Sequence, residues 1–531
     1  MSDNPIMGEA EPAELYTLEE PHSKSTEIDQ KSPGERAPAE PKPVNLRRWV
    51  GLAAGLLLAL LVYAILPDAL AHEGKVTAAV AVLMGVWWMT EALPIPATAL
   101  VPLVAFPLFS EVPINDIGAS YGNNIIFLFM GGFMLALAMQ RWNLHRRIAL
   151  LTLKVMGDKP GAMIAGFMIA TGFLSMWVSN TATAVMMLPI GMSVLLLVSQ
   201  KVPGMGEQTV SDSGEKIRKS NFGTALMLGI AYSASIGSLG TIIGTPPNTL
   251  LAGYMNENFG VNIGFGQWMM VGVPLSIVFM FITWFLLVKV LYKPEIKQIP
   301  GGKQLIQSEL ELLGPVSKGE TRVLIVFIFA AVSWIAVPLI FENPPISDAG
   351  IAVVVGLLLF IIPGGGARGV RLLDWHSAVE LPWGVLLLFG GGLALSSQFS
   401  SSGLTDWIGD VATGLGGLPV VVIVAILATA IVFLTELTSN TATAATFLPV
   451  AGGIALGIGV NPMLLAIPVA LTATCAFMLP VATPPNAVAY GSGYITIPEM
   501  VKAGFWLNLI GIVLVTLTTM TLAVWVFNLV Y

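Results

Sequence analysis

The sequence predicts an all-α membrane protein with eleven transmembrane helices and two re-entrant hairpins, arranged as an inverted repeat. Three observations lead there: an apolar composition, a pair of polar motifs that occurs twice, and a one-sided distribution of Lys and Arg. Of the 531 residues, 55% are hydrophobic and 11% are charged, and the mean hydropathy is +0.80. Apolar runs long enough to cross a bilayer, roughly 17–25 residues each, recur from about residue 49 onward. A soluble fold could not bury so much apolar surface.

Residues 1–46 differ from the rest of the chain because they are rich in Glu, Pro, Ser and Lys and poor in large apolar side chains. Such a segment cannot bury enough surface to offset its ordering entropy, so we expect a disordered cytoplasmic tail. It is also too polar for a signal peptide. Arg47 and Arg48 match a twin-arginine export signal. The long span and the many further spans that follow favour flanking positive charge that holds the N-terminus inside.

The apolar runs divide into spans. We expect helices near 49–66, 75–92, 95–110, 122–140, 221–253, 265–292, 321–341, 348–363, 382–400, 462–494 and 502–529. Two further stretches, 160–199 and 419–459, each carry a Ser-Asn-Thr motif at the middle and can hold two short helices. The motif frees backbone groups that lipid would not satisfy. We therefore expect each stretch to form a re-entrant hairpin whose tip is buried in protein.

The positive charges support this count. With the N-terminus inside and both hairpins returning to their own side, all of the 25 Lys and Arg except Lys75 fall on the cytoplasmic side, as the positive-inside rule requires. If either hairpin crossed the membrane fully, every later loop would change sides and the agreement would be lost. The amphipathic segment 141–155 is then expected on the cytoplasmic surface, and its counterpart near 403–415 outside.

Two polar motifs occur once in each half of the chain. Ser-Asn-Thr-Ala-Thr-Ala begins at Ser179 and again at Ser439, and Thr-Pro-Pro-Asn begins at Thr245 and again at Thr483. Both are polar or proline-broken patches inside long apolar stretches. Paired interruptions at matching places in two halves of a membrane protein indicate a transporter's binding site near the midplane.

The spacing of the motifs defines a duplicated unit. Glycine clusters at Gly131 and Gly391 lie 260 residues apart, as do the two Ser-Asn-Thr motifs, whereas the final Asn248 and Asn486 lie 238 apart. The missing 22 residues match a charged loop near 200–220 that only the first half contains. Because each unit holds five spans and a hairpin, the second copy enters the membrane from the opposite face, which makes an inverted repeat.

This repeat divides the chain into segments. They are the tail 1–46; residues 47–292, with the first span, the first repeat, the hairpin 160–199 and the broken helix 221–253; the cytoplasmic linker 293–320; and residues 321–531, with the second repeat, the hairpin 419–459 and the broken helix 462–494.

The motif residues suggest what the site binds. Ser, Thr and Asn side chains and broken backbone offer oxygens and helix N-termini, and no Lys or Arg lies in either hairpin. Helix N-termini attract anions, and freed carbonyl oxygens suit a small hard cation. A doubly charged anion then needs bound cations to leave water, and this interdependence would couple their transport. We expect one sodium ion beside each motif pair and the anion between the hairpin tips.

Few other side chains carry chemistry. The single cysteine, Cys475, excludes an intrachain disulfide or a Cys-based metal cluster, and the four histidines form no HExxH pattern. Glu436, three residues before Ser439, lies at membrane depth and is a candidate to tune a cation site. The alternative is a structural carboxylate bonded to the hairpin backbone. Glu91, at a span end, is expected to hold the membrane interface.

These motifs resemble the divalent anion/sodium symporter family of dicarboxylate, citrate and sulfate carriers, over about residues 48–531. The resemblance implies a homodimer in which a transport domain with the hairpins moves elevator-fashion against a scaffold domain. It implies sodium sites around Ser175, Ser179, Asn180 and Gly244, and around Thr435, Thr438, Asn440 and Ala482. It implies substrate contacts from Ser179, Asn180, Thr181, Ser439, Asn440 and Thr441, with Thr245 and Thr483 nearby.

The expected function is secondary transport: sodium-coupled uptake of C4-dicarboxylates such as succinate, fumarate or malate across the plasma (inner) membrane. Citrate or sulfate uptake, and sodium-independent dicarboxylate exchange, remain alternatives on the same fold. A membrane-embedded enzyme would need a catalytic constellation that the sequence lacks, and a channel fits an inverted repeat with two closed hairpins less well. We expect no cofactor besides the coupling sodium ions, and no nucleic-acid partner.

Overall fold

The computed structural model describes residues 41–201, 207–210, 216–341 and 344–530. The chain forms two units, Met1–Arg47 and Arg48–Tyr531, and the following concerns the second. Most of the tail expected to be disordered lies outside the described residues. Residues 42–46 at its end are helical, however, because α1 spans Lys42–Ile65.

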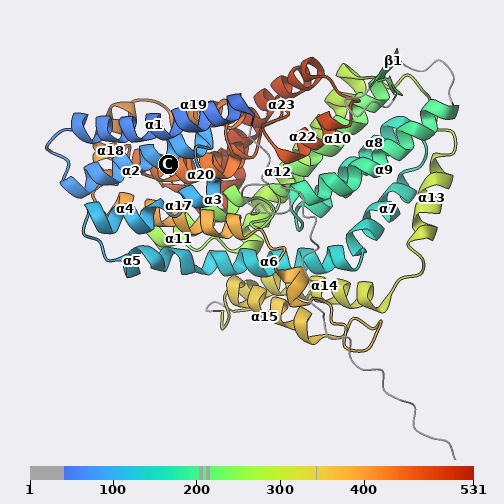
Figure 1. Cartoon of the computed structure of the whole chain (residues 1–531), viewed down its shortest axis with the longest axis horizontal. Helices are drawn as coiled ribbons and strands as arrows, with labels where there is room; N and C mark the ends of the chain where they lie inside the picture. The colour runs from blue at the N-terminus through green and yellow to red at the C-terminus, as the bar shows by residue number, and fades with distance from the viewer. Residues whose placement is uncertain (1–40, 202–206, 211–215, 342–343, 531) are drawn as a thin grey trace, which may run out of the picture. The chain divides into compact units, whose positions relative to one another are not determined.

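The fold is helical (Figure 1). After α1 the helices are α2 His72–Thr90, α3 Ile95–Thr98, α4 Val101–Phe109, α5 Ile114–Ala119, α6 Asn124–Arg141, α7 Leu144–Met156, α8 Pro160–Ser175, α9 Asn180–Lys201, α10 Asn221–Ser238, α11 Pro246–Phe259, α12 Phe265–Phe285, α13 Gly302–Leu312, α14 Lys318–Ile340, α15 Asp348–Ile361, α16 Trp375–Ala378, α17 Trp383–Ser401, α18 Leu404–Ala412, α19 Val420–Thr435, α20 Asn440–Gly457, α21 Met463–Ala473, α22 Pro484–Gly491, α23 Ile497–Thr518 and α24 Val524–Phe527.

Seven of the described helices or continuous helical stretches are long and apolar enough to cross a membrane, and an eighth arises if the bent pair Leu404–Leu415 and Val420–Thr435 counts as one span. Four shorter apolar stretches, Ile95–Phe109, Pro160–Ser175, Asp348–Ile361 and Met463–Ala473, are too short to pass alone. The all-α class of the prediction is confirmed apart from one small ribbon, and the seven or eight long apolar helices support a multi-pass membrane protein.

The two halves repeat the same order of elements. From α8 to α19, and at the first residues of α9 and α20, the offset is 260 residues. The broken helices α10–α11 and α21–α22 follow, with Pro246 and Pro484 at the matching start. Both last spans change to π-helix at the same place, η2 Leu286–Leu291 after α12 and η4 Thr519–Ala523 after α23. The sequence duplication is therefore a structural one.

The glycine pair of the duplicated unit permits two equivalent close approaches. A Cβ on Gly131 of α6 would lie 2.4 Å from the carbonyl oxygen of Ala352 on α15, and a Cβ on Gly391 of α17 would lie 2.3 Å from that of Ala99. Only glycine allows helix backbones to meet this closely, as is common in packed membrane helices.

Three elements differ from expectation. The loop near 200–220 contains a two-stranded antiparallel ribbon, β1 Glu207–Val210 and β2 Lys216–Lys219. The linker 293–320 contains helix α13. The last span begins at Ile497 rather than 502, because Thr496 and Glu499 form a capping box that starts α23 earlier.

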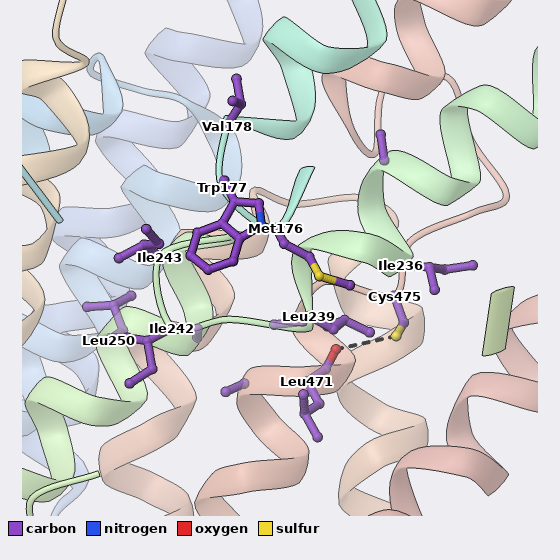
Figure 2. Packing of buried hydrophobic residues seen from close by; sticks show 14 of the residues in the cluster. Met176, Trp177, Val178, Ile236, Leu239, Ile242, Ile243, Leu250, Leu471 and Cys475 are labelled. Atoms are coloured by element: carbon purple, nitrogen blue, oxygen red, sulfur yellow. Dashed lines mark hydrogen bonds between the residues drawn. The ribbon is translucent and has the colours of Figure 1, made fainter. Parts of the chain in front are cut away.

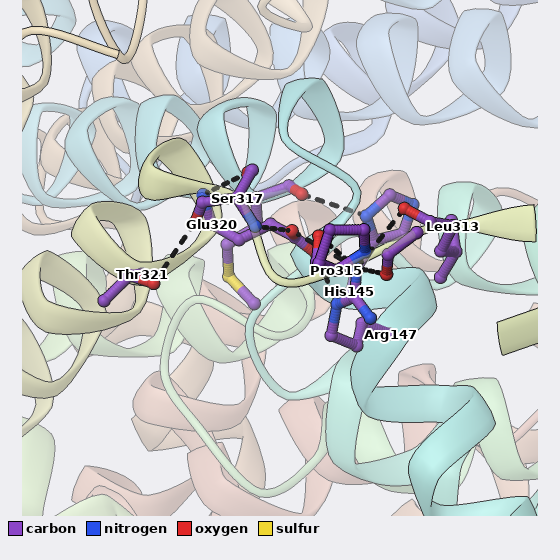
Figure 3. Close-up of polar contacts among 9 residues, drawn as sticks. His145, Arg147, Leu313, Pro315, Ser317, Glu320 and Thr321 are labelled. Carbon is purple, nitrogen blue, oxygen red and sulfur yellow. Dashed lines mark hydrogen bonds and ion pairs between the residues drawn. The ribbon is translucent and has the colours of Figure 1, made fainter. Parts of the chain in front are cut away.

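Helix α7 is fixed to the start of α14 by a buried ion pair (Figure 3). Arg147 Nε donates to Glu320 Oε1 at 2.6 Å, and Arg147 Nη2 donates to the carbonyl oxygen of Gly314 at 3.0 Å. Glu320 Oε2 also accepts from the backbone N–H of Ser317 at 2.7 Å, which completes a capping box. The α13–α14 junction is therefore bound to the amphipathic helix α7, which also packs on α8.

The helices of the second unit pack as two groups. The hairpins α8–α9 and α19–α20 pack with the broken helices and with α12 and α23; we call these the hairpin group. The helices α2–α6 pack with α14, α15 and α17; we call these the frame group. In Figure 1, α14 and α15 lie alongside α6, away from the first hairpin.

Candidate functional site

The two Ser-Asn-Thr motifs occupy corresponding turns between hairpin arms. Helix α8 ends at Ser175 and α9 begins at Asn180, and α19 ends at Thr435 and α20 begins at Asn440. The side chains predicted to bind substrate at these turns are partly exposed, although most neighbouring residues are buried; they are Ser179, Asn180, Thr181, Ser439, Asn440 and Thr441. The motif side chains therefore face accessible space.

Each first arm is joined to a broken helix at its last residue. Ser175 Oγ donates to the carbonyl oxygen of Ala234 at 2.6 Å, and Thr435 Oγ1 donates to that of Ala473 at 2.9 Å. The structure thus brings two predicted sodium ligands to similar positions on the broken helices. The acceptors Ala234 and Ala473 lie 239 residues apart, one more than the offset of 238 between the two Thr-Pro-Pro-Asn motifs. Thr435 Oγ1 also lies 2.8 Å from Asn440 Oδ1, an alternative acceptor for the same hydroxyl hydrogen, so two of the second predicted set are in direct contact.

The other predicted sodium ligands have different surroundings. Gly244 and Ala482 lie in the two helix breaks, one residue before Thr245 and Thr483. A Cβ on Gly244 would lie 2.2 Å from the carbonyl oxygen of Ser238, so glycine is required there. The hydroxyl of Thr438 is bonded within the second hairpin and not to the helix break. It lies 2.7 Å from Thr443 Oγ1 and donates to the carbonyl oxygen of Leu434.

The asparagine that ends each Thr-Pro-Pro-Asn motif holds its helix break together. Asn248 Nδ2 donates to the carbonyl oxygens of Leu239 and Thr241, at 3.3 and 2.9 Å. Asn486 Nδ2 donates to two carbonyl oxygens of the second break, those of Ala476 and Leu479, both at 3.1 Å. Within the described part of the chain, the buried Oδ1 atoms of both asparagines accept no hydrogen bond. Each break therefore contains a buried amide oxygen without a hydrogen-bond partner among the described residues.

The threonines of these motifs behave differently in the two halves. Thr483 Oγ1 accepts from the backbone N–H of Asn486 at 3.3 Å and caps α22, as a Thr-Pro helix start predicts. Thr245 holds the same N-cap position but makes no such bond. Its Oγ1 lies 3.3 Å from Thr474 Oγ1, at the end of α21, so this contact joins the two breaks directly.

Apolar side chains close the space behind the first turn. Figure 2 shows Met176 and Trp177 beside residues of the first break and near the end of α21, whereas Val178 points away from the break. The single cysteine of the chain, Cys475, lies there as a buried thiol that donates to Leu471 O at 3.3 Å. The tip is thus anchored in protein on one side and accessible on the other.

The carboxylate of Glu436 accepts hydrogen bonds from the backbone of the second break. Its Oε1 accepts from the backbone N–H groups of Phe477 and Met478, at 2.7 and 2.9 Å, and Oε2 accepts from that of Leu479 at 3.1 Å. Asn508 of α23 adds a fourth donor at 2.7 Å. The carboxylate makes structural bonds, as the alternative interpretation held, but to the broken helix rather than to the hairpin backbone. The first half has Met176 at this position.

Several site residues were not singled out from the sequence. Asn508 is an isolated amide in an apolar helix, which is a usable signal because such residues need a partner in the membrane. Ala234 and Ala473 contribute only carbonyl oxygens and carry no signal. Glu91 is exposed at the C-cap of α2 with φ of 50°, consistent with a span end.

Comparison with known proteins places the chain in a family. The family described as the sodium:sulfate symporter transmembrane region matches residues 46–529. The chain is 43% identical over 484 residues to the sodium-dependent dicarboxylate transporter SdcS of Staphylococcus saprophyticus, covering 90% of this chain and 92% of that protein. The SdcS of Staphylococcus aureus is 43% identical over 482 residues, covering 90% and 91%.

A solved structure shares the fold. The YdaH transporter of Alcanivorax borkumensis, described as having an unusual topology, aligns with a TM-score of 0.52 and 13% identity, over 92% of this chain and 99% of that one. At this identity the likeness concerns the fold alone. The match of the family across nearly the whole chain shows that this protein belongs to the sodium:sulfate symporter family.

Proposed function

We propose that this protein is a secondary transporter that couples sodium influx to the uptake of C4-dicarboxylates such as succinate, fumarate or malate. The observation that carries the proposal is the pair of oxygen-rich hairpin turns and helix breaks, joined through Thr245 and Thr474, without a Lys or Arg in either hairpin. The relatives with 43% identity are named sodium-dependent dicarboxylate transporters, and transporters of this kind carry out no chemical step.

Charge explains the coupling. A dicarboxylate that enters this site meets hydroxyls, amides and helix N-termini, which attract anions but do not neutralise two negative charges. Sodium ions supply the missing charge when they bind beside it. Ser175, Ser179, Asn180 and Gly244 would hold one ion, and Thr435, Thr438, Asn440 and Ala482 a second. The anion would lie between the motif side chains at Ser179–Thr181 and Ser439–Thr441, near Thr245 and Thr483.

The ends of each hairpin support a re-entrant arrangement. The backbone N–H of Ile299 donates to the carbonyl oxygen of Asp158 at 2.9 Å, just before α8 begins, and a Cβ on Gly301 would lie 2.6 Å from Lys201 Nζ, where α9 ends. Both ends of the first hairpin therefore meet one short segment. In the second, α20 ends at Gly457 against Gly409 of α18, the helix that leads into α19.

We therefore propose eleven spans, two hairpins and a cytoplasmic N-terminus in the plasma (inner) membrane. The hairpin group forms the mobile transport domain and the frame group the scaffold, through which two copies form a homodimer. The hairpin group would carry substrate and sodium across the membrane as one body.

The packing between the two groups is one-sided. Helices α11 and α20 of the hairpin group pack on α17, and α20 also packs on α2. Their counterparts in the other repeat, α22 and α9, make at most marginal contact with α6 and α14 in the described part of the chain. In the proposed orientation the packed side is external. We infer that this structure faces the cytoplasm.

A set of hydrogen bonds stabilises this packed side; we call it the outer clasp. Glu257 at the end of α11 accepts from Ser120 Oγ at 2.8 Å and from Asn123 Nδ2 at 3.0 Å, just before α6. The adjacent Asn258 donates to Ser396 Oγ at 2.9 Å and accepts from Ser400 Oγ at 2.8 Å, on α17. Two neighbouring residues of the hairpin group thus hold two helices of the frame group.

The first prediction concerns the hairpin turns. Asn180→Ala and Asn440→Ala should each abolish sodium-driven succinate uptake, because each removes an amide oxygen shared by the proposed sodium and substrate sites. Thermal unfolding and dimerisation should change little, since Thr435 keeps its bond to Ala473 O. Ser193→Ala, further along α9, is the matched control and should transport normally. Normal uptake by either asparagine variant would refute the site assignment.

The second prediction separates a structural Glu436 from a sodium ligand. Glu436→Gln places an N–H donor against backbone donors and leaves at least one of them unpaired, which costs about 1–3 kcal/mol. The thermal midpoint in detergent should fall, while the rise in midpoint on adding sodium persists, because a ligand stabilises whatever state binds it. Glu111→Gln, at an exposed site, is the control. An unchanged midpoint with no response to sodium would instead identify Glu436 as a sodium ligand.

The third prediction tests the outer clasp. Asn258→Ala removes its two hydrogen bonds to α17, of about 0.5–1.5 kcal/mol each. Together they amount to about 1–3 kcal/mol, so the ratio of outward- to inward-facing protein should rise at least about fivefold, since 1.4 kcal/mol represents a factor of ten. Replacing Cys475 by Ser and Thr181 by Cys gives a single reporter at the hairpin turn. Its labelling by an impermeant maleimide added outside should increase in Asn258→Ala and stay low in Asn256→Ala. Equal labelling of both variants would exclude the clasp.

A further inference from the structure

A cavity of about 550 Å³ lies between α12, α14 and the residues that lead into α15, away from the hairpin turns. Its size falls within the range of small-molecule sites, about 300–1,000 Å³. Its walls are mainly apolar, and the lining includes Met269, Met270, Val273, Ile335 and Leu339. None of the residues predicted to bind substrate or sodium lines it, so this cavity is distinct from the proposed transport site.

One end of the cavity is polar. Asn262, Gln267, Ser347 and Asp348 line that end, and Asp348 is the one charged residue among the lining residues. Asp348 also accepts from the backbone N–H of Phe265 at 2.9 Å, which fixes its carboxylate at the start of α12. Without Lys or Arg in the lining, the cavity repels a dicarboxylate or an anionic head group and favours a cationic or neutral one.

The surroundings determine what can enter. Both α12 and α14 belong to stretches that pass as membrane spans. Lining residues at the surface are exposed, Met270 by 47%, Ile335 by 40% and Leu339 by 81%, and exposed apolar residues such as Ile277 continue along α12. Such a surface faces the hydrocarbon of the bilayer. An apolar cavity that opens there is reached by acyl chains and not by water-borne ligands.

The cavity also lies where the two helix groups meet. Helix α12 packs on α8, α10 and α23 of the hairpin group, whereas α14 and α15 pack on each other and on α6 of the frame group. Direct packing between α12 and α14 is slight by comparison. The cavity is therefore a space at this seam that the side chains of the two groups leave unfilled.

We propose that an acyl chain of a bilayer phospholipid occupies this cavity, with an ammonium-bearing head group, as in phosphatidylethanolamine, at the polar end near Asp348. The chain fills the apolar part between Met269 and Ile335, and the head group meets the carboxylate and the nearby amides. If the hairpin group moves against the frame group, as proposed above, the lipid lies between the two groups where they slide past each other. The site itself does not depend on that movement.

Photolabelling of the full-length protein in proteoliposomes tests the site. The probe is phosphatidylethanolamine with a diazirine in the middle of one acyl chain, and adducts are mapped by mass spectrometry. We expect adducts on residues 262–273 and 334–348 at several times the level on other exposed apolar surface. Phosphatidylglycerol with the same label should give weaker labelling there. Stronger labelling by phosphatidylglycerol would overturn the assignment of the head group.

Two variants give the matched comparison. Val273→Trp fills the cavity and should abolish these adducts, whereas Ile277→Trp adds the same indole on the exposed face of the same helix and should leave them unchanged. Gly266→Leu is a second filling variant, since a Cβ there meets only ordinary contacts, with Ile335 Cα at 3.6 Å. Equal labelling in the filling and control variants would overturn the proposal. Absence of adducts because the second protomer of a dimer covers the cavity opening would also overturn it. Because labelling needs no transport, failure of the proposed function would not affect the result.

Discussion

The structure depends on the need to satisfy backbone groups that two helix breaks release within an apolar protein. Unpaired N–H and C=O groups at this depth cost several kcal/mol each. Asn248 and Asn486 bond the carbonyl oxygens of the breaks, and Glu436 bonds three N–H groups of the second. These side chains bond only some of the backbone groups of each break. The hairpin turns and helix N-termini beside the breaks are left to bind ligands. The requirement for backbone pairing thus also creates a polar site.

Duplication provides two such sites, and their differences are informative. The first-arm bonds of Ser175 and Thr435 are equivalent, but only the second break has a carboxylate. The larger difference is in packing: α11 and α20 contact the frame group, whereas their repeat counterparts α22 and α9 make at most marginal contact with it in the described part of the chain. If equivalent elements of the two repeats exchange their packing against the frame group, the binding site opens to the opposite side of the membrane. The outer clasp and the lipid-filled seam lie on the surfaces that such an exchange must break.

Much of the fold could be predicted where long apolar runs are interrupted by recognisable helix-start motifs. The stretch 160–199 contains two helices around its Ser-Asn-Thr motif, α8 and α9, and the Thr-Pro-Pro-Asn motifs start α11 and α22 at the predicted prolines. Positions fixed by tertiary contacts could not be predicted. The roles of Asn508 and Glu257 require knowing which helices are neighbours, and Ala234 contributes only a backbone oxygen. The ribbon β1–β2 and helix α13 lie in polar segments without an apolar run to reveal them.

The most direct test of the central claim is uptake of radiolabelled succinate into proteoliposomes, with and without an inward sodium gradient, in competition with unlabelled malate, citrate and sulfate. The proposed function predicts uptake that requires the sodium gradient and is inhibited by malate more strongly than by citrate or sulfate. Uptake that occurs only into vesicles preloaded with dicarboxylate, and that is indifferent to sodium, would contradict it and would remove both sodium sites from the mechanism.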